Sequence, residues 1–134
     1  MLNKILIVTS SYDLTVDYII EKYGEEHNFF RMNTDKLSEY EVCVHNYNDF
    51  WEIKDKYGEI QSNKLKAVYY RKPVLPDLGA YEPHYHNLMA KEILTLIEGI
   101  VESCDRRCLS KPSVLKRADN KILQLKLAKE VGFV

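Results

Sequence analysis

The sequence predicts an α/β fold with an open, mainly parallel sheet, and three observations support this prediction. A continuous run of apolar and β-branched residues at Lys4–Thr9 is typical of a strand buried on both faces of a parallel sheet. A helical repeat and a second short strand, Phe29–Met32, follow it, and about 30 residues are enough for one βαβ unit. Strand character then returns at Lys66–Arg71. We expect helices to pack on the sheet and the crossover to be right-handed.

The first helix is expected between Asp13 and Gly24. Asp13 is suited to its N-terminus, because a carboxylate accepts the free N–H groups of a first turn. The apolar residues follow the helical repeat: Val16, Ile19, Ile20 and Tyr23. We expect Gly24 to end the helix in the left-handed region, which a residue without a Cβ adopts cheaply.

The next stretch predicts antiparallel strands. Glu41–Asn46 and Phe50–Lys54 alternate between apolar and polar residues, and Glu59–Gln61 is a candidate third strand. A polar turn around residues 55–58 separates the last two. Such alternation is typical of strands with one face in water. The pattern therefore predicts a β-hairpin inserted before the return strand at Lys66–Arg71.

Two helices and a short strand are expected after that return strand. Pro73 and Pro76 predict a loop over residues 73–81. Apolar residues at helical spacing predict a long helix from about Glu82 to Cys104, and Cys108–Ser110 is a candidate strand. A final helix is expected from about Leu115 to Val131, ended by Gly132, with an inner row of Ala118, Ile122, Leu125 and Ala128.

Charge is distributed unevenly along a chain whose net charge is only −1. Residues 106–134 hold eight basic and two acidic side chains, whereas residues 1–105 hold 11 basic and 18 acidic ones. A basic tail on an acidic body suggests an anionic partner, a complementary domain surface or a solvated helix face. Nucleic acid is a poor candidate, because the basic tail lacks the interleaved aromatic residues of a stacking surface.

Composition places the chain among ordinary globular proteins. Of its 134 residues, 46% are hydrophobic and 29% are charged, which excludes a disordered composition. There is no apolar run of about 18 residues and no signal-peptide pattern, so we expect a cytoplasmic protein without a membrane span. Three cysteines without a CxxC pair indicate reduced thiols rather than disulfides or a zinc site.

The loop Ser10–Asp13 is the first candidate site. It follows a buried strand, and ligands bind open α/β sheets at the carboxyl ends of the strands. Its hydroxyl groups and helix N-terminal amides can hold an anion. The loop has no glycine, so it is neither a dinucleotide-binding fingerprint nor a P-loop. Helix capping alone also explains Ser11 and Asp13.

The segment Tyr69–Pro73 is the second candidate site. Arg71 and Lys72 leave a predicted buried strand, and Pro73 fixes the direction of exit. A guanidinium at a strand end can grip a carboxylate or a phosphate with two hydrogen bonds. The alternative is that Arg71 pairs with an acidic residue of its own domain. Neither candidate supplies a catalytic group.

His84 and His86 form an HxH pattern near the start of the long helix. Side chains two positions apart on a helix do not face one another, although an extended segment could present both histidines to one metal ion. Surface or capping roles therefore explain these histidines better than a metal site does. No spacing in the chain draws a nucleophile and a base together.

Three segments, in this order and spacing, resemble the N-terminal region of ATP-grasp peptide maturases. They are Lys4–Tyr18, Lys66–Pro73 and Lys111–Phe133, of which Tyr69–Pro73 and the series Lys116, Asn120, Lys121, Gln124, Ala128 and Gly132 are the most specific. These enzymes make graspetides of the microviridin and thuringinin types. The resemblance implies a Rossmann-like pre-ATP-grasp domain over residues 1–114. Residues 115–134 are then a linker helix leading toward an ATP-grasp domain outside these 134 residues.

The resemblance also implies a function. Such enzymes use ATP and magnesium to phosphorylate an acidic side chain of a ribosomal precursor peptide, and a hydroxyl or amine then attacks the acyl phosphate to form an ester or an amide. This domain would bind neither ATP nor magnesium and would be inactive alone. Its expected partners are the precursor peptide, with its acidic core, and the ATP-grasp module, and the family implies that homo-oligomers can form.

The expected substrate-binding residues are Arg71, Lys72, Tyr70, Ser10, Ser11 and Asp13. Two other interpretations remain open. One is a stand-alone α/β domain that binds a small anion or an acidic peptide through the same residues. The other, a response-regulator-like domain, is weak, because it requires an acidic cluster after the first strand and only Asp13 is present.

Overall fold

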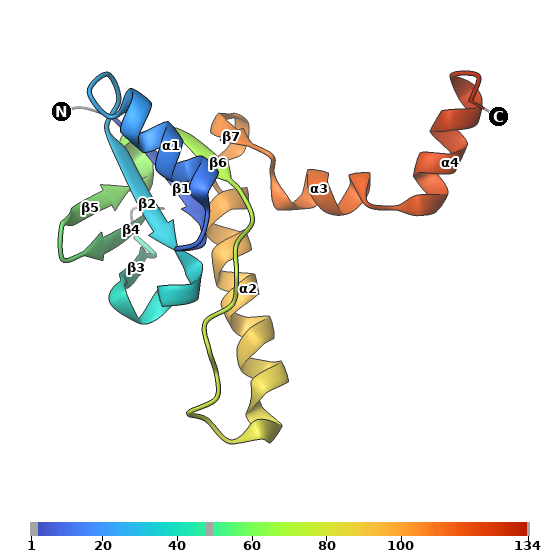
Figure 1. Cartoon of the computed structure of the whole chain (residues 1–134). Coiled ribbons are helices and arrows are strands. Elements are labelled where there is room, and N and C mark those ends of the chain that lie inside the picture. Colours follow the sequence, from blue (N-terminus) through green and yellow to red (C-terminus); the bar gives the residue numbers. More distant parts are fainter. Residues whose placement is uncertain (1–2, 48–49, 134) are drawn as a thin grey trace.

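Four parallel strands form the main sheet of the computed structural model, which describes residues 3–47 and 50–133. Their order is β2-β1-β6-β7 (Figure 1), and the strands are β1 (Lys4–Thr9), β2 (Phe29–Asn33), β6 (Leu65–Tyr70) and β7 (Cys108–Leu109). The predicted parallel sheet is therefore confirmed. The outermost residues of the predicted domain ranges, 1, 2 and 134, lie outside the described residues.

Helices cover both faces of this sheet (Figure 1): α1 (Leu14–Tyr23) lies on one face and α2 (His86–Glu102) on the other. Successive side chains of β1 point to opposite faces. Leu6 and Val8 join the core cluster to which α2 contributes Ile97, Ile100 and Val101. Ile7 is buried on the α1 side of the sheet, and Val16 is the buried residue of α1. Because β1 is buried on both faces, its sequence reads as a continuous apolar run.

The predicted insertion is a three-stranded antiparallel sheet of β3 (Glu41–His45), β4 (Phe50–Asp55) and β5 (Gly58–Gln61). Short 3₁₀ turns, η1 (Thr34–Glu39) and η2 (Ser62–Lys64), connect it to the main sheet. Its inner residues Trp51, Ile53 and Ile60 belong to the same core cluster. The Trp51 indole also donates to the Ser103 hydroxyl at 2.9 Å, just after α2. The insertion is thus packed on the body of the domain.

The end of α1 differs from the prediction. Gly24 has φ −65°, so it does not enter the left-handed region. Its amide donates to the Ile20 carbonyl at 2.9 Å, and a Cβ built at Gly24 would lie only 2.5 Å from that oxygen. The position requires glycine because of this close approach, not because of a positive φ.

The long helix is confirmed, with shorter bounds. A 3₁₀ turn, η3 (Pro83–Tyr85), precedes α2, and a second one, η4 (Asp105–Arg107), leads into β7. Cys104 therefore lies beyond the end of α2, and Cys108 lies in β7. All three cysteines are free. Burial raises the pKa of the Cys108 thiol to about 11.

The predicted final helix is wrong as a single element. The chain forms α3 (Pro112–Ala118) and α4 (Lys121–Glu130), which extend away from both sheets (Figure 1). The break occurs because the Asn120 side chain accepts the Leu123 amide at 3.1 Å and starts a new helix there.

The expected inner row does not face a core either. Ile122 is 82% exposed and Leu125 is 72% exposed. The role of Gly132, in contrast, is confirmed. It has φ +92°, and its amide and that of Phe133 donate to the carbonyls of Lys129 and Ala128, which is a Schellman motif.

Candidate functional site

Three loops meet at the carboxyl edge of the parallel sheet, where β1, β2 and β6 end. Thr34, the residue after β2, holds them together and is fully buried. Its hydroxyl accepts the amide of Val74 at 2.8 Å and lies 2.8 Å from the Val74 carbonyl and 3.1 Å from the Thr9 carbonyl. One buried threonine therefore joins the ends of β1 and β2 to the loop after β6.

Asp13 is the centre of the polar contacts at this edge. One carboxylate oxygen accepts the amides of Thr15 and Val16 at 3.1 and 3.4 Å, which confirms the predicted helix cap. The other oxygen accepts the Thr9 hydroxyl at 2.8 Å and Arg71 Nε at 3.0 Å. The Asp13 side chain is only 5% exposed. The carboxylate thus links the end of β1, the start of α1 and the end of β6.

Two carboxylates at this edge have a lowered pKa. Burial opposes the ionisation of Asp13, but the Thr9 hydroxyl, the charge of Arg71 and the Val16 amide outweigh it, so its pKa lies below the ordinary value. Burial likewise opposes the ionisation of Asp35, and the hydroxyl and amide of Ser11 outweigh it. The Ser11 amide donates to Asp35 at 2.7 Å, and the Ser11 hydroxyl also donates to this carboxylate. Both aspartates are therefore held as anions.

Arg31 joins β2 to the same loop. Its guanidinium donates to the Ser10 carbonyl at 2.8 Å and to the Asn33 side chain at 2.7 Å, and it forms an ion pair with Asp17 of α1. The Arg31 side chain is 18% exposed, whereas Asp17 is 48% exposed. The edge is thus a network of internal charge pairs and caps.

Arg71 pairs with an acidic residue of its own domain, Asp13, which was the alternative that the sequence left open. Besides Asp13, its guanidinium contacts the Thr15 hydroxyl at 3.1 Å and the Tyr69 hydroxyl at 3.4 Å, so all three of its nitrogen atoms have a partner. Its amide extends the ladder by donating to the Val8 carbonyl at 2.8 Å. Arg71 therefore fixes the exit of β6 and does not present a free fork to a ligand.

The other expected site residues lie in three environments. Tyr70 is 8% exposed and belongs to the core cluster. Ser10 is buried, and Ser11 is partly buried against Asp35. Lys72 is exposed and has φ +45°, which is uncommon for a residue with a side chain. Of the expected residues, Lys72 is the charged group that faces solvent.

Sequence reasoning did not identify Arg31, Thr34 and Asp35 as members of this edge. A signal for them existed, because Thr34 and Asp35 directly follow a strand and Arg31 is a charge inside one. Apart from the Arg31–Asn33 bond, the partners of their side chains are 14 to 40 residues away in the sequence, so local spacing does not indicate the pairs.

The contacts given for the two histidines of the HxH pattern are not with residues of this edge. His86 Nε2 lies 2.9 Å from the Tyr81 carbonyl, and the centroid of the His84 ring lies 3.9 Å from that of Tyr85, with the two rings tilted by 42°. Within residues 3–47 and 50–133, no group of three or more histidine, cysteine, aspartate or glutamate side chains could hold a metal ion. In the same part of the chain, no helix is long and apolar enough to cross a membrane.

Comparison with known proteins identifies one family. The family model described as the MvdD pre-ATP grasp domain matches residues 4–115, which is most of the chain. No curated protein sequence matches.

Solved structures share the fold over nearly the whole chain. The macrocyclase MdnC of Microcystis aeruginosa MRC, bound with its precursor peptide MdnA, has a TM-score of 0.87 and 24% identity over 96% of this chain. A RiPP-associated ATP-grasp ligase of Chryseobacterium gregarium, in complex with ADP and a leader and core peptide, has a TM-score of 0.81 and 25% identity over 98%. The macrocyclase MdnB of M. aeruginosa MRC has a TM-score of 0.75 and 26% identity over 97%. The matched region is 44%, 42% and 45% of those chains, so this chain spans less than half of their length.

Proposed function

Because the chain belongs to the family of MvdD pre-ATP grasp domains, we propose that it is the N-terminal domain of an ATP-dependent ligase that cross-links side chains of a ribosomal precursor peptide. The family match over residues 4–115 carries this proposal. The similarity to MdnC, bound with a precursor peptide, and to a RiPP ligase, bound with ADP and peptide, supports it.

The proposed reaction proceeds in two steps. A carboxylate of the precursor peptide attacks the γ-phosphorus of ATP, which gives an acyl phosphate and ADP. A hydroxyl or amine of the same peptide then attacks the acyl carbon, phosphate leaves, and an ester or an amide forms. Each cross-link removes one water from the peptide. We assign ATP and magnesium to the ATP-grasp module of the full-length protein and not to residues 1–134.

In this proposal, residues 1–134 form a platform for the peptide and the catalytic module. The carboxyl edge of the sheet faces the peptide, and Lys72 supplies an exposed cation for an acidic core. Arg71, Tyr70, Ser10, Ser11 and Asp13 act through position: their mutual contacts and burial fix the loops that carry Lys72. They hold this edge in shape and carry out no chemical step.

The proposed domain boundary lies near residue 114. Residues 1–114 form the pre-ATP-grasp domain, and residues 115–134 form a linker toward the ATP-grasp module. Exposed apolar side chains on this linker support the assignment, because such surfaces mark docking faces. The most exposed are Ile122, Leu125, Val131 and Phe133.

The proposal is tested with the full-length protein, its precursor peptide, ATP and magnesium. We expect mass spectrometry to detect the loss of one water per cross-link, together with the formation of ADP and phosphate. ATP hydrolysis without any mass change of the peptide contradicts the proposal.

A charge reversal at Lys72 tests the role of the sheet edge. Lys72→Glu should raise the KM for an acidic peptide about fivefold with little change in kcat, because an exposed charge contributes about 1 kcal/mol to binding. Lys66→Glu is the matched control, since Lys66 is also exposed but lies at the start of β6. Equal effects of the two substitutions exclude a specific role for Lys72.

A further inference from the structure

β2 is an edge strand of the main sheet, and one side of its backbone faces away from β1. The Ile5 amide donates to the Asn28 carbonyl at 2.8 Å, so residue 28 directs its backbone groups toward β1. In a parallel strand, alternate residues direct their N–H and C=O groups to opposite sides. Phe29, Arg31 and Asn33 therefore direct theirs toward the open edge. An open edge of this kind can pair with a further strand.

Tyr40 occupies the carboxyl half of that edge. The Asn33 amide donates to the Tyr40 hydroxyl at 2.9 Å, and this hydroxyl donates to the Arg31 carbonyl at 3.2 Å. A residue of a parallel strand placed opposite Met32 would use the same donor and the same acceptor. The tyrosine hydroxyl thus replaces one residue of a missing neighbouring strand.

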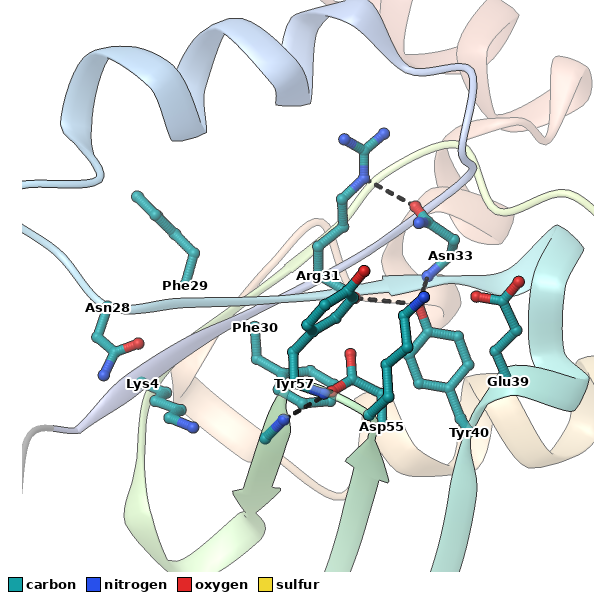
Figure 2. Close-up of a pocket in the computed structure, with 12 residues that line it drawn as sticks. Lys4, Asn28, Phe29, Phe30, Arg31, Asn33, Glu39, Tyr40, Asp55 and Tyr57 are labelled. Carbon is teal, nitrogen blue, oxygen red and sulfur yellow. Dashed lines mark hydrogen bonds between the residues drawn. The ribbon is translucent and has the colours of Figure 1, made fainter.

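One step earlier along β2, the corresponding acceptor and donor at the open edge are the Phe29 carbonyl and the Arg31 amide. Both residues line a groove of about 710 Å³ that runs along β2, which we call the β2-edge groove. Within residues 3–47 and 50–133, neither of these two backbone groups has a hydrogen bond. Figure 2 shows Phe29 and Arg31 on the α1 side of β2, and Tyr40, Asp55 and Tyr57 on the side of β4 and β5.

The walls of the groove restrict what can enter it. Tyr40 stands at one end, and the turn from Asp55 to Gly58 stands along the side of the hairpin sheet. The Asp55 carboxylate fixes that turn by accepting the amides of Tyr57 and Gly58 at 2.8 Å each. A strand that already belongs to another sheet would bring neighbours that collide with these walls. A single extended peptide has none.

We propose that the β2-edge groove binds an extended segment of the precursor peptide as an added parallel strand. The proposed function supplies the identity of this peptide, whereas the pairing itself rests on the backbone groups of β2. A parallel strand would run in the direction of β2, toward Tyr40 and the carboxyl end of the sheet. Pairing of main-chain groups gives such binding its affinity, and pockets for alternate side chains give it selectivity.

The groove selects by shape more than by charge. Its lining includes the cations Lys4, Arg31 and Lys56 together with the anions Glu39 and Asp55, and Arg31 is already paired with Asp17. The aromatic rings of Phe29 and Tyr57 stand on its two sides, and Tyr57 is 83% exposed. An added strand with an apolar side chain facing one of these rings fits this lining best.

The probe is a randomised decapeptide library displayed on phage and selected on the 134-residue chain. Phe29→Pro removes an outward amide and places a proline ring at the edge, while the inward ladder of β2 stays intact. Phe29→Ala is the matched control, because it removes the same side chain and keeps the amide. We expect binders to be enriched on the wild type, and their affinity for Phe29→Pro to be at least tenfold lower than their affinity for Phe29→Ala. No enrichment on the wild type, or equal binding to both variants, overturns the inference.

A scan of single N-methyl groups along a selected peptide tests the strand geometry. Affinity should fall at every second position, because only alternate amides of an added strand donate to β2. Tyr40→Phe frees the Arg31 carbonyl and the Asn33 amide, so it should tighten binding about twofold to tenfold. If N-methylation weakens binding without alternating from one position to the next, the peptide does not bind as an added strand.

A competition experiment tests whether the precursor peptide is the ligand that binds the β2-edge groove. A selected decapeptide should inhibit cross-linking by the full-length protein competitively with the precursor peptide. If it binds at β2 without inhibiting, the precursor is not the occupant. If the full-length protein shows no ligase activity, the proposed function fails, while the phage and N-methyl results still decide whether the groove binds a strand.

Discussion

Asp13 contacts the end of β1, the first turn of α1 and the guanidinium of Arg71 at the same time. Its neighbours fix its charge, since the carboxylate is almost fully buried and its oxygens accept four hydrogen bonds. Removing that charge would leave Arg71 without its anion. A single side chain therefore determines whether the loops at the carboxyl edge keep their arrangement.

Asp13→Asn should lower the free energy of unfolding by about 2 kcal/mol, because a largely buried ion pair loses one partner. Urea unfolding followed by circular dichroism measures this change. Asp17→Asn is the matched control: it also breaks an aspartate–arginine pair, but Asp17 is 48% exposed, so about 0.5 kcal/mol is expected. Equal losses of unfolding free energy in the two variants would show that the burial of Asp13 does not strengthen its ion pair with Arg71.

The pH dependence of stability should follow the same carboxylates. The pKa values of Asp13 and Asp35 lie below their ordinary value of 3.8 in the folded chain, so the unfolded chain binds more protons at low pH. Their contribution is present above pH 3.8 and is lost as the pH falls through the folded values. The difference in unfolding free energy between wild type and Asp13→Asn should therefore shrink below pH 3.8. A difference that stays constant between pH 6 and pH 3 contradicts this.

Local signals at the residue scale were sufficient for some contacts and insufficient for others. The Asp13 cap was predictable, because its partners Thr15 and Val16 are two and three residues away. The Arg31–Asp17 and Ser11–Asp35 contacts were not, because they exist only after β1 and β2 pair. The edge could be located from the sequence, but its network could not.

Replacing glycine by alanine should have opposite effects on stability at the end of α1 and in the interior of α2. Gly24→Ala should destabilise the fold by about 1–3 kcal/mol, because its Cβ would meet the Ile20 carbonyl at 2.5 Å. Gly99→Ala should stabilise it by about 0.5–1 kcal/mol, because Gly99 lies inside α2 and an added Cβ meets nothing within 4 Å. Thermal unfolding of both variants measures the two signs. Stabilisation by both substitutions would contradict the close approach at Gly24.

Element types were predictable where one periodicity dominated. The strands of the main sheet are short apolar runs, and α2 has a continuous apolar stripe, so each could be identified from its own residues. The break between α3 and α4 could not, because the helical spacing of apolar residues continues through Asp119 and Asn120. The Asn120 cap takes precedence there because no core holds the two halves in line.

On the scale of the whole molecule, burial decreases sharply after α2. α3 is attached to α2 by the Ser113 amide, which donates to Glu102 at 2.7 Å, and by the Lys116–Glu98 ion pair at 2.5 Å. α4 has only ten residues, and none of those described is fully buried. A helix of this length is marginal without tertiary packing.

The amides of α4 should therefore exchange in the isolated chain at nearly the rates of an unfolded peptide, whereas those of Ile97, Ile100 and Val101 in α2 should be protected. Hydrogen exchange followed by NMR measures both sets. In the full-length protein, α4 should gain protection if it packs on the ATP-grasp module as proposed. Strong protection of α4 in the isolated chain would contradict the weak packing described above.

The central position of β1 has a consequence for synthesis on the ribosome. β1 pairs with β2 on one side and with β6 on the other, and Leu6 aligns with Val68 across a separation of 62 residues. At about 5–20 residues per second, translation reaches Val68 about 3–12 s after Leu6. During that interval one side of the most apolar strand is without its neighbour, which makes the nascent chain a target for chaperones and for aggregation. Chains that stall before Tyr70 should therefore be less soluble than chains that stall after it.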